Sequence, residues 1–215
     1  MQDSLETAAY FPTAVYSISK PEFVAPALAV FNELIAKRCN KKASNKLYPS
    51  HMTPNMFMDP RVKDLATYIA GTAWNILDAQ GHNLENQITY FLSLWGQEHH
   101  YSSSMDEHVH NLGTQIVGFY ILDAPEKSSR LVVHDPRPGR VQINLPEKSS
   151  NEATYASAMV SFPLETGKLY FTNAWLPHSF TRHANTTKPL KFLHFNLGVQ
   201  HVPHAPQKEE GPVIV

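Results

Sequence analysis

Two histidines stand close together in Met105-Asp106-Glu107-His108-Val109-His110, which is followed by an apolar run over residues 114–122 (TQIVGFYIL). Side chains alternate along a strand, so His108 and His110 point to the same face of an extended segment. A third imidazole, His178, lies in a later segment, Ala174 to Ser179. Two neighbouring histidines plus one from a distant strand are typical of an open metal site in a β-barrel. Solvated or hydrogen-bonded histidine pairs also have this spacing, so spacing alone does not decide.

The order of the sequence patterns predicts the fold class. Two amphipathic helices come first, one beginning near Pro21 and one between Asp59, a natural N-cap, and Gly81, a natural stop. After Gly81 the spacing of apolar residues changes from the helical period to the alternation of strands. Helices followed by short strands favour an α+β protein, a double-stranded β-helix (jelly-roll or cupin-like barrel) backed by two N-terminal helices. The predicted strands cover residues 13–19, 87–95, 114–122, 130–134, 139–145, 153–162, 168–172, 179–183 and 190–199.

We expect a single domain over residues 1–215. It comprises a helical support region (1–86), the β-helix core (87–200) and an extended tail (201–215). Residues 40–54, a polar segment with two prolines, are expected to form a loop.

Composition excludes several classes of protein. A net charge of −1 gives no support for nucleic-acid binding. No run approaches the roughly 18 apolar residues of a membrane helix, and the N-terminus has no signal-peptide pattern. The single cysteine, Cys39, fits a reducing compartment, so we expect a cytoplasmic protein without a membrane partner.

A series of motifs in order carries a resemblance to a known family. They are Trp95, His108-Val109-His110, Gly118-Phe119-Tyr120-Ile121, Val132 to Arg137, Gly167 to Phe171, Trp175-Leu176-Pro177-His178 and Phe195-Asn196-Leu197. Over roughly residues 90–199 the chain resembles the 2-oxoglutarate/Fe(II)-dependent oxygenases of phages and marine bacteria, distant relatives of the prolyl hydroxylases. The resemblance implies a hydroxylase that uses Fe(II), 2-oxoglutarate and O2, stimulated by ascorbate, and acts on a small molecule or peptide.

The resemblance also implies roles for individual residues. His108 and His178 correspond to metal ligands, and Tyr120 to a residue that hydrogen-bonds the cosubstrate carboxylate. The alternative for Tyr120 is a place in the barrel core, with its hydroxyl satisfied by a neighbour. Position 110 is a departure, because the wider superfamily has Asp or Glu there. Either His110 ligates, giving a three-histidine site, or a carboxylate comes from Asp106 or Asp135. We favour His110, because it occupies the expected position and imidazole is a normal ligand for iron.

A second departure concerns the basic residue that holds the distal carboxylate of 2-oxoglutarate in the family. The candidates are Arg182, Lys188 and Lys191. Lys191 is best by position, but alternation turns it outward if Phe192 and His194 face inward, unless a bulge intervenes. Arg182 has the inward parity of His178. Cosubstrate binding is in doubt if none of the three lines the pocket.

Two other hypotheses remain open. A cupin-like metalloenzyme would use three histidines without 2-oxoglutarate. A jelly-roll structural or binding protein would carry incidental histidines and no stoichiometric metal.

Overall fold

The computed structural model describes residues 5–39, 50–139 and 145–203. Its helices are α1 (Val24–Cys39) and α2 (Lys63–Ala79), each preceded by a 3-10 turn, Pro21–Phe23 and Pro60–Val62 respectively. Its strands are β1 (Val15–Ser19), β2 (Ser50–Met52), β3 (Gln87–His99), β4 (Met105–His108), β5 (Ile116–Asp123), β6 (Leu131–His134), β7 (Met159–Phe162), β8 (Lys168–Asn173), β9 (His178–Phe180) and β10 (Leu190–His201).

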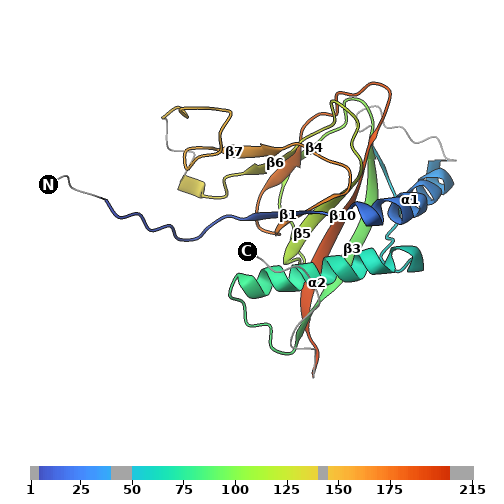
Figure 1. The fold of residues 1–215 in the computed structure, drawn as a ribbon, viewed down its shortest axis with the longest axis horizontal. Helices are drawn as coiled ribbons and strands as arrows, with labels where there is room; N and C mark the ends of the chain where they lie inside the picture. Colours follow the sequence, from blue (N-terminus) through green and yellow to red (C-terminus); the bar gives the residue numbers. More distant parts are fainter. Residues whose placement is uncertain (1–4, 40–49, 140–144, 204–215) are drawn as a thin grey trace.

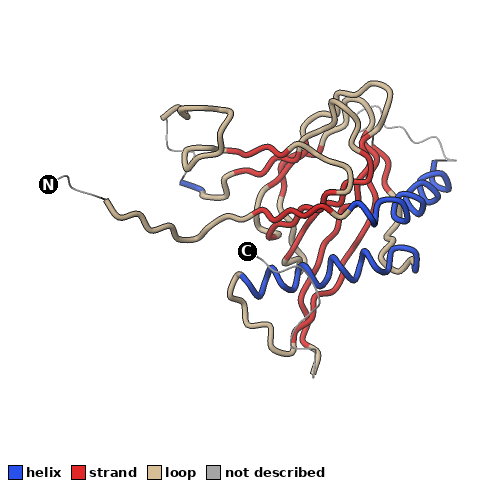
Figure 2. Tube along the Cα trace, viewed as in Figure 1, coloured by secondary structure: helices blue, strands red, loops and turns tan. Residues whose placement is uncertain are grey.

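The strands form two antiparallel sheets. The large sheet has the order β1-β8-β5-β10-β3-β2, and the small sheet has the order β4-β9-β6-β7. Both helices lie on one side of the large sheet, as Figures 1 and 2 show. This is the predicted double-stranded β-helix backed by N-terminal helices.

Two apolar cores correspond to the two faces of the large sheet. Alternation along β5 shows the division, since Tyr120 and Leu122 pack toward the helices while Phe119 and Ile121 pack toward the small sheet. The barrel core also contains Leu131, Tyr170, Phe180, Leu190 and Phe192. Aromatic and aliphatic side chains therefore line the space between the two sheets, except where the histidines lie.

Close contact between α1 and the sheet requires a glycine at one position. A Cβ added at Gly96 of β3 would clash with the ring of Phe31, which is fully buried. Glycine here lets α1 pack directly on the sheet backbone and fixes the helix above β3.

The local signals in the sequence explain both helix starts. Asp59 caps the turn before α2, with its side chain accepting a hydrogen bond from the Arg61 amide at 3.0 Å, and Pro60 occupies the first position. The turn before α1 likewise begins at Pro21, and the chain leaves α2 at Gly81, which has a positive φ of 88°. The predicted helices are thus confirmed.

Most predicted strands are also confirmed, although β3 continues to His99 beyond the predicted end at residue 95, and β9 ends at Phe180 before the predicted end at residue 183. Residues 50–52, predicted as loop, form β2 because they pair with the end of β3. The strand predicted over 153–162 begins only at Met159, since the preceding residues form turns. Most of the strand predicted over 139–145, and most of the predicted tail, lie outside the described residues.

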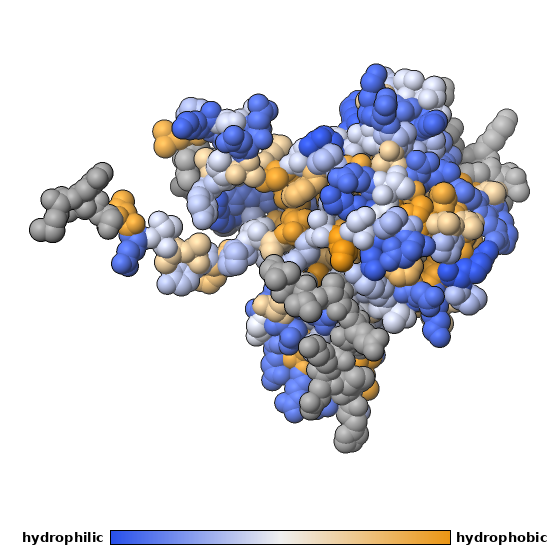
Figure 3. Space-filling view, in the orientation of Figure 1, coloured by the Kyte–Doolittle hydropathy of each residue, from blue (hydrophilic) through white to orange (hydrophobic). Residues whose placement is uncertain are grey.

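The surface is mixed. Hydrophobic and hydrophilic side chains are interspersed on the face shown in Figure 3, from which the N-terminal arm projects. In the described part of the chain, no helix combines the length and apolar character needed to cross a membrane.

Candidate metal centre

Three histidines meet where β4 and β9 pair in the small sheet. His108 and His178 are register partners across that pair, and His110 follows just beyond β4. The ring centroids lie 4.6 Å (His108–His178), 5.0 Å (His108–His110) and 5.1 Å (His110–His178) apart. One nitrogen from each ring lies within 4.8 Å of the others. The structure therefore brings together the three residues that the sequence singled out.

Backbone carbonyls fix the tautomers of two of these rings. Nδ1 of His108 donates to the Asp106 carbonyl at 2.7 Å, and Nδ1 of His178 donates to the Leu176 carbonyl at 2.9 Å. A neutral imidazole that donates through Nδ1 keeps its lone pair on Nε2. Both rings thus present Nε2 as the atom available to a metal. A hydrogen bond from the other ring nitrogen to a carbonyl is typical of metal-binding histidines.

Burial favours the neutral form of two of the three rings. Burial lowers the pKa of His178 to about 4 and that of His110 to about 4, with the nearby His108 contributing in the same direction. Nε2 of His110 and Nε2 of His178 are buried and have no hydrogen-bond partner in the described part of the chain. A divalent cation would satisfy these lone pairs, so the residues present fit a metal ion.

A cleft opens beside the three histidines, with a volume of about 390 Å³. Its rim includes the exposed apolar side chains of Val109 and Leu112. The walls are Leu92, Ser93, His108, Val109, His110, Asn111, Leu112, Thr114 and Asn196. A small molecule in this cleft would lie directly against two of the three imidazoles.

A chain of buried polar side chains runs inward from the centre. The ring of His194 contacts that of His110, with centroids 5.1 Å apart. Gln97 joins His194 to His99, through contacts of 3.3 Å to Nδ1 of His194 and 3.1 Å to Nε2 of His99. Sequence analysis did not single out these residues, although the inward parity of His194 on its strand was a usable signal.

The structure contradicts the expectation for Tyr120. Its side chain lies in the core between the large sheet and the helices, and its hydroxyl donates to the Lys20 carbonyl at 2.6 Å. The neighbouring residue Phe119 faces the site instead, in edge contact with His178. Alternation along β5 thus places Tyr120 on the face opposite the histidines.

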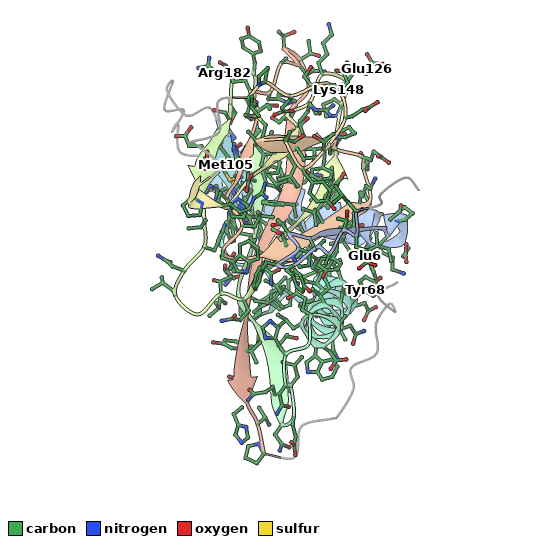
Figure 4. All side chains as sticks on the ribbon, turned by 90° about the vertical axis from the view of Figure 1, so that its left-hand side faces the viewer. Glu6, Tyr68, Met105, Glu126, Lys148 and Arg182 are labelled. Carbon is green, nitrogen blue, oxygen red and sulfur yellow. The ribbon has the colours of Figure 1, made fainter. Side chains whose placement is uncertain are left out.

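The basic candidates also lie outside the barrel. Arg182 is exposed beyond the end of β9, where the parity argument no longer applies, and Nη1 contacts Oγ of Ser102 at 3.5 Å. Figure 4 shows it at the upper end of the molecule, beyond Met105 of β4. Lys188 is exposed as well.

Lys191 faces α1, as its parity required. Its ammonium donates to Oδ1 of Asn32 at 2.8 Å. Among the residues that the structure describes, no lysine or arginine is buried. The expectation of a cation clamping 2-oxoglutarate inside the barrel was therefore wrong for all three candidates.

Neither alternative carboxylate joins the three histidines. Asp106 is exposed, and Asp135 forms an ion pair with Arg137, whose Nη2 lies 2.7 Å from Oδ2. Within the described residues, the group around His108 contains imidazoles alone.

Solved structures provide the comparison with known proteins. An oxidoreductase of the 2OG-Fe(II) oxygenase family from Burkholderia pseudomallei matches with a TM-score of 0.52 at 10% identity, over 86% of this chain and 84% of that one. The carbocyclase SnoK of nogalamycin biosynthesis, which is alpha-ketoglutarate dependent, matches with a TM-score of 0.60 at 12% identity, over 92% and 89%. The fold is that of the 2-oxoglutarate/Fe(II) oxygenases.

A prolyl-4-hydroxylase from Pseudomonas putida shares this oxygenase fold, with a TM-score of 0.55 at 10% identity over 86% of this chain and 92% of that one. No protein-family model and no curated protein matches the sequence. The similarity is therefore one of fold, and the chemistry has to be argued from the residues.

Proposed function

We propose that the protein is a non-haem Fe(II)- and 2-oxoglutarate-dependent oxygenase, a hydroxylase whose metal is held by His108, His110 and His178. The observation that carries the proposal is the set of three adjacent imidazoles in an oxygenase fold, two of which have buried Nε2 atoms without a partner among the described residues. With iron, 2-oxoglutarate and O2 bound, such a centre supplies the oxidation of a C–H bond and releases succinate and CO2.

Three neutral ligands have an electrostatic consequence. A carboxylate ligand would cancel part of the charge of Fe(II), whereas three imidazoles leave it at +2. Dianionic 2-oxoglutarate would then neutralise the metal. The positive charge of the metal thus attracts the cosubstrate, a role that a buried lysine or arginine would otherwise share.

His194 is the residue best suited to receive a carboxylate of the cosubstrate. The Gln97 amide nitrogen donates to Nδ1 of His194, so the proton of that neutral ring resides on Nε2. This Nε2 is buried and has no partner within the described residues. An unpaired N–H beside the metal ligands favours an oxygen acceptor there. We therefore propose that a neutral hydrogen-bond donor does the work of the missing cation.

The cleft supports a small-molecule substrate. It combines the apolar side chains of Leu92, Val109 and Leu112 with the polar ones of Ser93 and Asn111. Two proteins of the same fold were solved with organic molecules bound, SnoN with nogalamycin RO and HygX with hygromycin B. We propose an uncharged or weakly charged organic substrate, and a cytoplasmic location in line with the single cysteine.

A second candidate function rests on the absence of any buried lysine or arginine among the described residues. It is a metal-dependent enzyme on the same three histidines that does not use 2-oxoglutarate.

Anaerobic addition of 2-oxoglutarate to the Fe(II) protein separates the two. The proposal predicts a weak visible charge-transfer band and, with O2, succinate formation that is lost in His108→Ala and His178→Ala. A stoichiometric metal with neither band nor succinate would favour the second candidate. Purified protein that takes up no transition metal would contradict both.

A further inference from the structure

A second group of metal-binding side chains lies away from the proposed iron centre. His51 on β2, Glu98 near the end of β3 and His100 just after β3 each offer one ligand atom, and these atoms lie within 4.8 Å of one another. We call these three residues the edge cluster, because β2 is the last strand of the large sheet. The proposed function makes no use of it.

The edge cluster is built in the same way as the three-histidine centre. Glu98 and His51 are register partners on adjacent antiparallel strands, as His108 and His178 are. His100 follows Glu98 by two residues, as His110 follows His108. In both places a cross-strand pair and an i, i+2 neighbour put three ligands on one face of a sheet.

The distances fit coordination of one ion. Oε1 of Glu98 lies 3.3 Å from Nδ1 of His51 and 2.8 Å from Nε2 of His100. Bonds of about 2.1 Å to a tetrahedral ion place neighbouring ligand atoms roughly 3.4 Å apart, so small adjustments would admit the ion. The two imidazole rings stand edge to face, with centroids 4.9 Å apart.

Burial separates this cluster from an ordinary surface ion pair. The Glu98 side chain is 11% exposed, and those of His51 and His100 are 29% and 41% exposed. A buried carboxylate held between two partly exposed imidazoles leaves one side open for a water molecule. Two histidines, one glutamate and an open position form a common ligand set for Zn²⁺.

We propose that the edge cluster is a second metal site, which binds Zn²⁺ or a similar divalent transition metal through His51, Glu98 and His100. The ion would tie the short strand β2 to the end of β3. This proposal does not depend on the oxygenase activity, because it concerns other residues.

The positive charge of Lys191 opposes metal binding at the edge cluster. The Lys191 ammonium lies 3.6 Å from Oε2 of Glu98. A positive charge at this distance weakens the binding of a cation. Lys191→Met should therefore raise the affinity for zinc, whereas a purely hydrogen-bonded cluster would show no zinc affinity in either form.

Zinc stoichiometry of the full-length protein tests the proposal. We titrate zinc against a chromophoric chelator in a His108→Ala/His178→Ala variant, which lacks the proposed iron site, and expect one equivalent to bind. Adding Glu98→Gln should abolish this equivalent, and Glu165→Gln, at a carboxylate paired with Lys168 at 3.0 Å, should leave it unchanged.

If the His108→Ala/His178→Ala variant does not fold, the same titration is made on the wild-type protein. Wild type should bind two equivalents, and Glu98→Gln alone should bind one and lose part of the zinc-induced rise in melting temperature. A single equivalent in wild type that survives Glu98→Gln would overturn the second site while leaving the first intact. Two equivalents that both survive Glu98→Gln would also overturn it.

Discussion

His108 and His178 face each other across the β4–β9 pair, with their ring centroids 4.6 Å apart. Residues 70 positions apart in the sequence are thus made neighbours by strand register. Each ring is oriented by a carbonyl two residues before it, that of Asp106 or Leu176. The local backbone therefore helps to orient both rings.

His110 should behave as a ligand. We expect His110→Ala to lower the affinity for Fe(II) by at least tenfold, because only two protein ligands remain. His110→Asp should retain iron, since a carboxylate is an accepted ligand at an open iron site. Iron content after gel filtration measures both, in a Glu98→Gln background that lacks the edge cluster. Unchanged iron in His110→Ala would show that a residue outside this group completes the site.

The buried histidines predict how stability depends on pH. Burial lowers the pKa of His99 and that of His178 to about 4, below the ordinary value of about 6.5. The unfolded chain therefore binds more protons than the folded chain between these values. The contribution of these rings to the free energy of unfolding should be complete above pH 6.5. It should fall as pH decreases toward 4, by up to about 1.4 kcal/mol per pH unit per histidine.

Urea unfolding of the metal-free protein at several pH values between 7.5 and 5 checks this expectation. His99→Phe, which has no titratable group, should flatten the dependence. A free energy of unfolding that rises as pH falls would contradict the assignment of neutral buried rings.

His194 should control binding of the cosubstrate. His194→Phe keeps the ring volume but removes the N–H, so we expect the Kd for 2-oxoglutarate to rise about tenfold or more, in line with roughly 1.5–3 kcal/mol for a hydrogen bond to a charged group. His194→Gln supplies an amide N–H at a similar reach and should restore much of the affinity. The charge-transfer band under anaerobic conditions gives the Kd. An unchanged Kd in His194→Phe would contradict this role of the N–H group.

Tyr120 should contribute to stability and not to cosubstrate binding. Tyr120→Phe removes the hydrogen bond to the Lys20 carbonyl and should lower the free energy of unfolding by about 1 kcal/mol. The Kd for 2-oxoglutarate should stay unchanged, because the ring faces the helices. A weakened Kd with unaltered stability would reverse this assignment.

The packing of α1 on the sheet should be a main source of stability. Phe31 is fully buried against Gly96, so Phe31→Ala should cost about 3–5 kcal/mol. Phe11→Ala is the matched control, since Phe11 is 97% exposed, and it should change stability by less than about 0.5 kcal/mol. Urea unfolding of the two variants provides the comparison.

Local rules were sufficient to predict the helices and most strands, whereas the choice of the three histidines as ligands also needed the resemblance to the oxygenase family. Pro60 and Asp59 start a helix through their own backbone chemistry, and the His-x-His pair is visible in one short segment. The fold class followed from the order of these elements.

Tertiary context decided what the sequence missed. Strand β2 exists only because the end of β3 offers it a partner, and Glu98 meets His51 through the same pairing. The error at Tyr120 came from matching a residue type to a family position without applying the alternation of β5. The error at Arg182 came from extending strand parity beyond the end of β9.

Iron K-edge X-ray absorption of the Fe(II) protein counts the imidazoles that hold the metal, on which the proposed function rests. The measurement uses the Glu98→Gln variant, which lacks the edge cluster, loaded with one equivalent of iron. The three-histidine centre predicts imidazole scattering from three nitrogen ligands, reduced to two in His110→Ala. Two imidazoles in the parent protein, unchanged by His110→Ala, would contradict it.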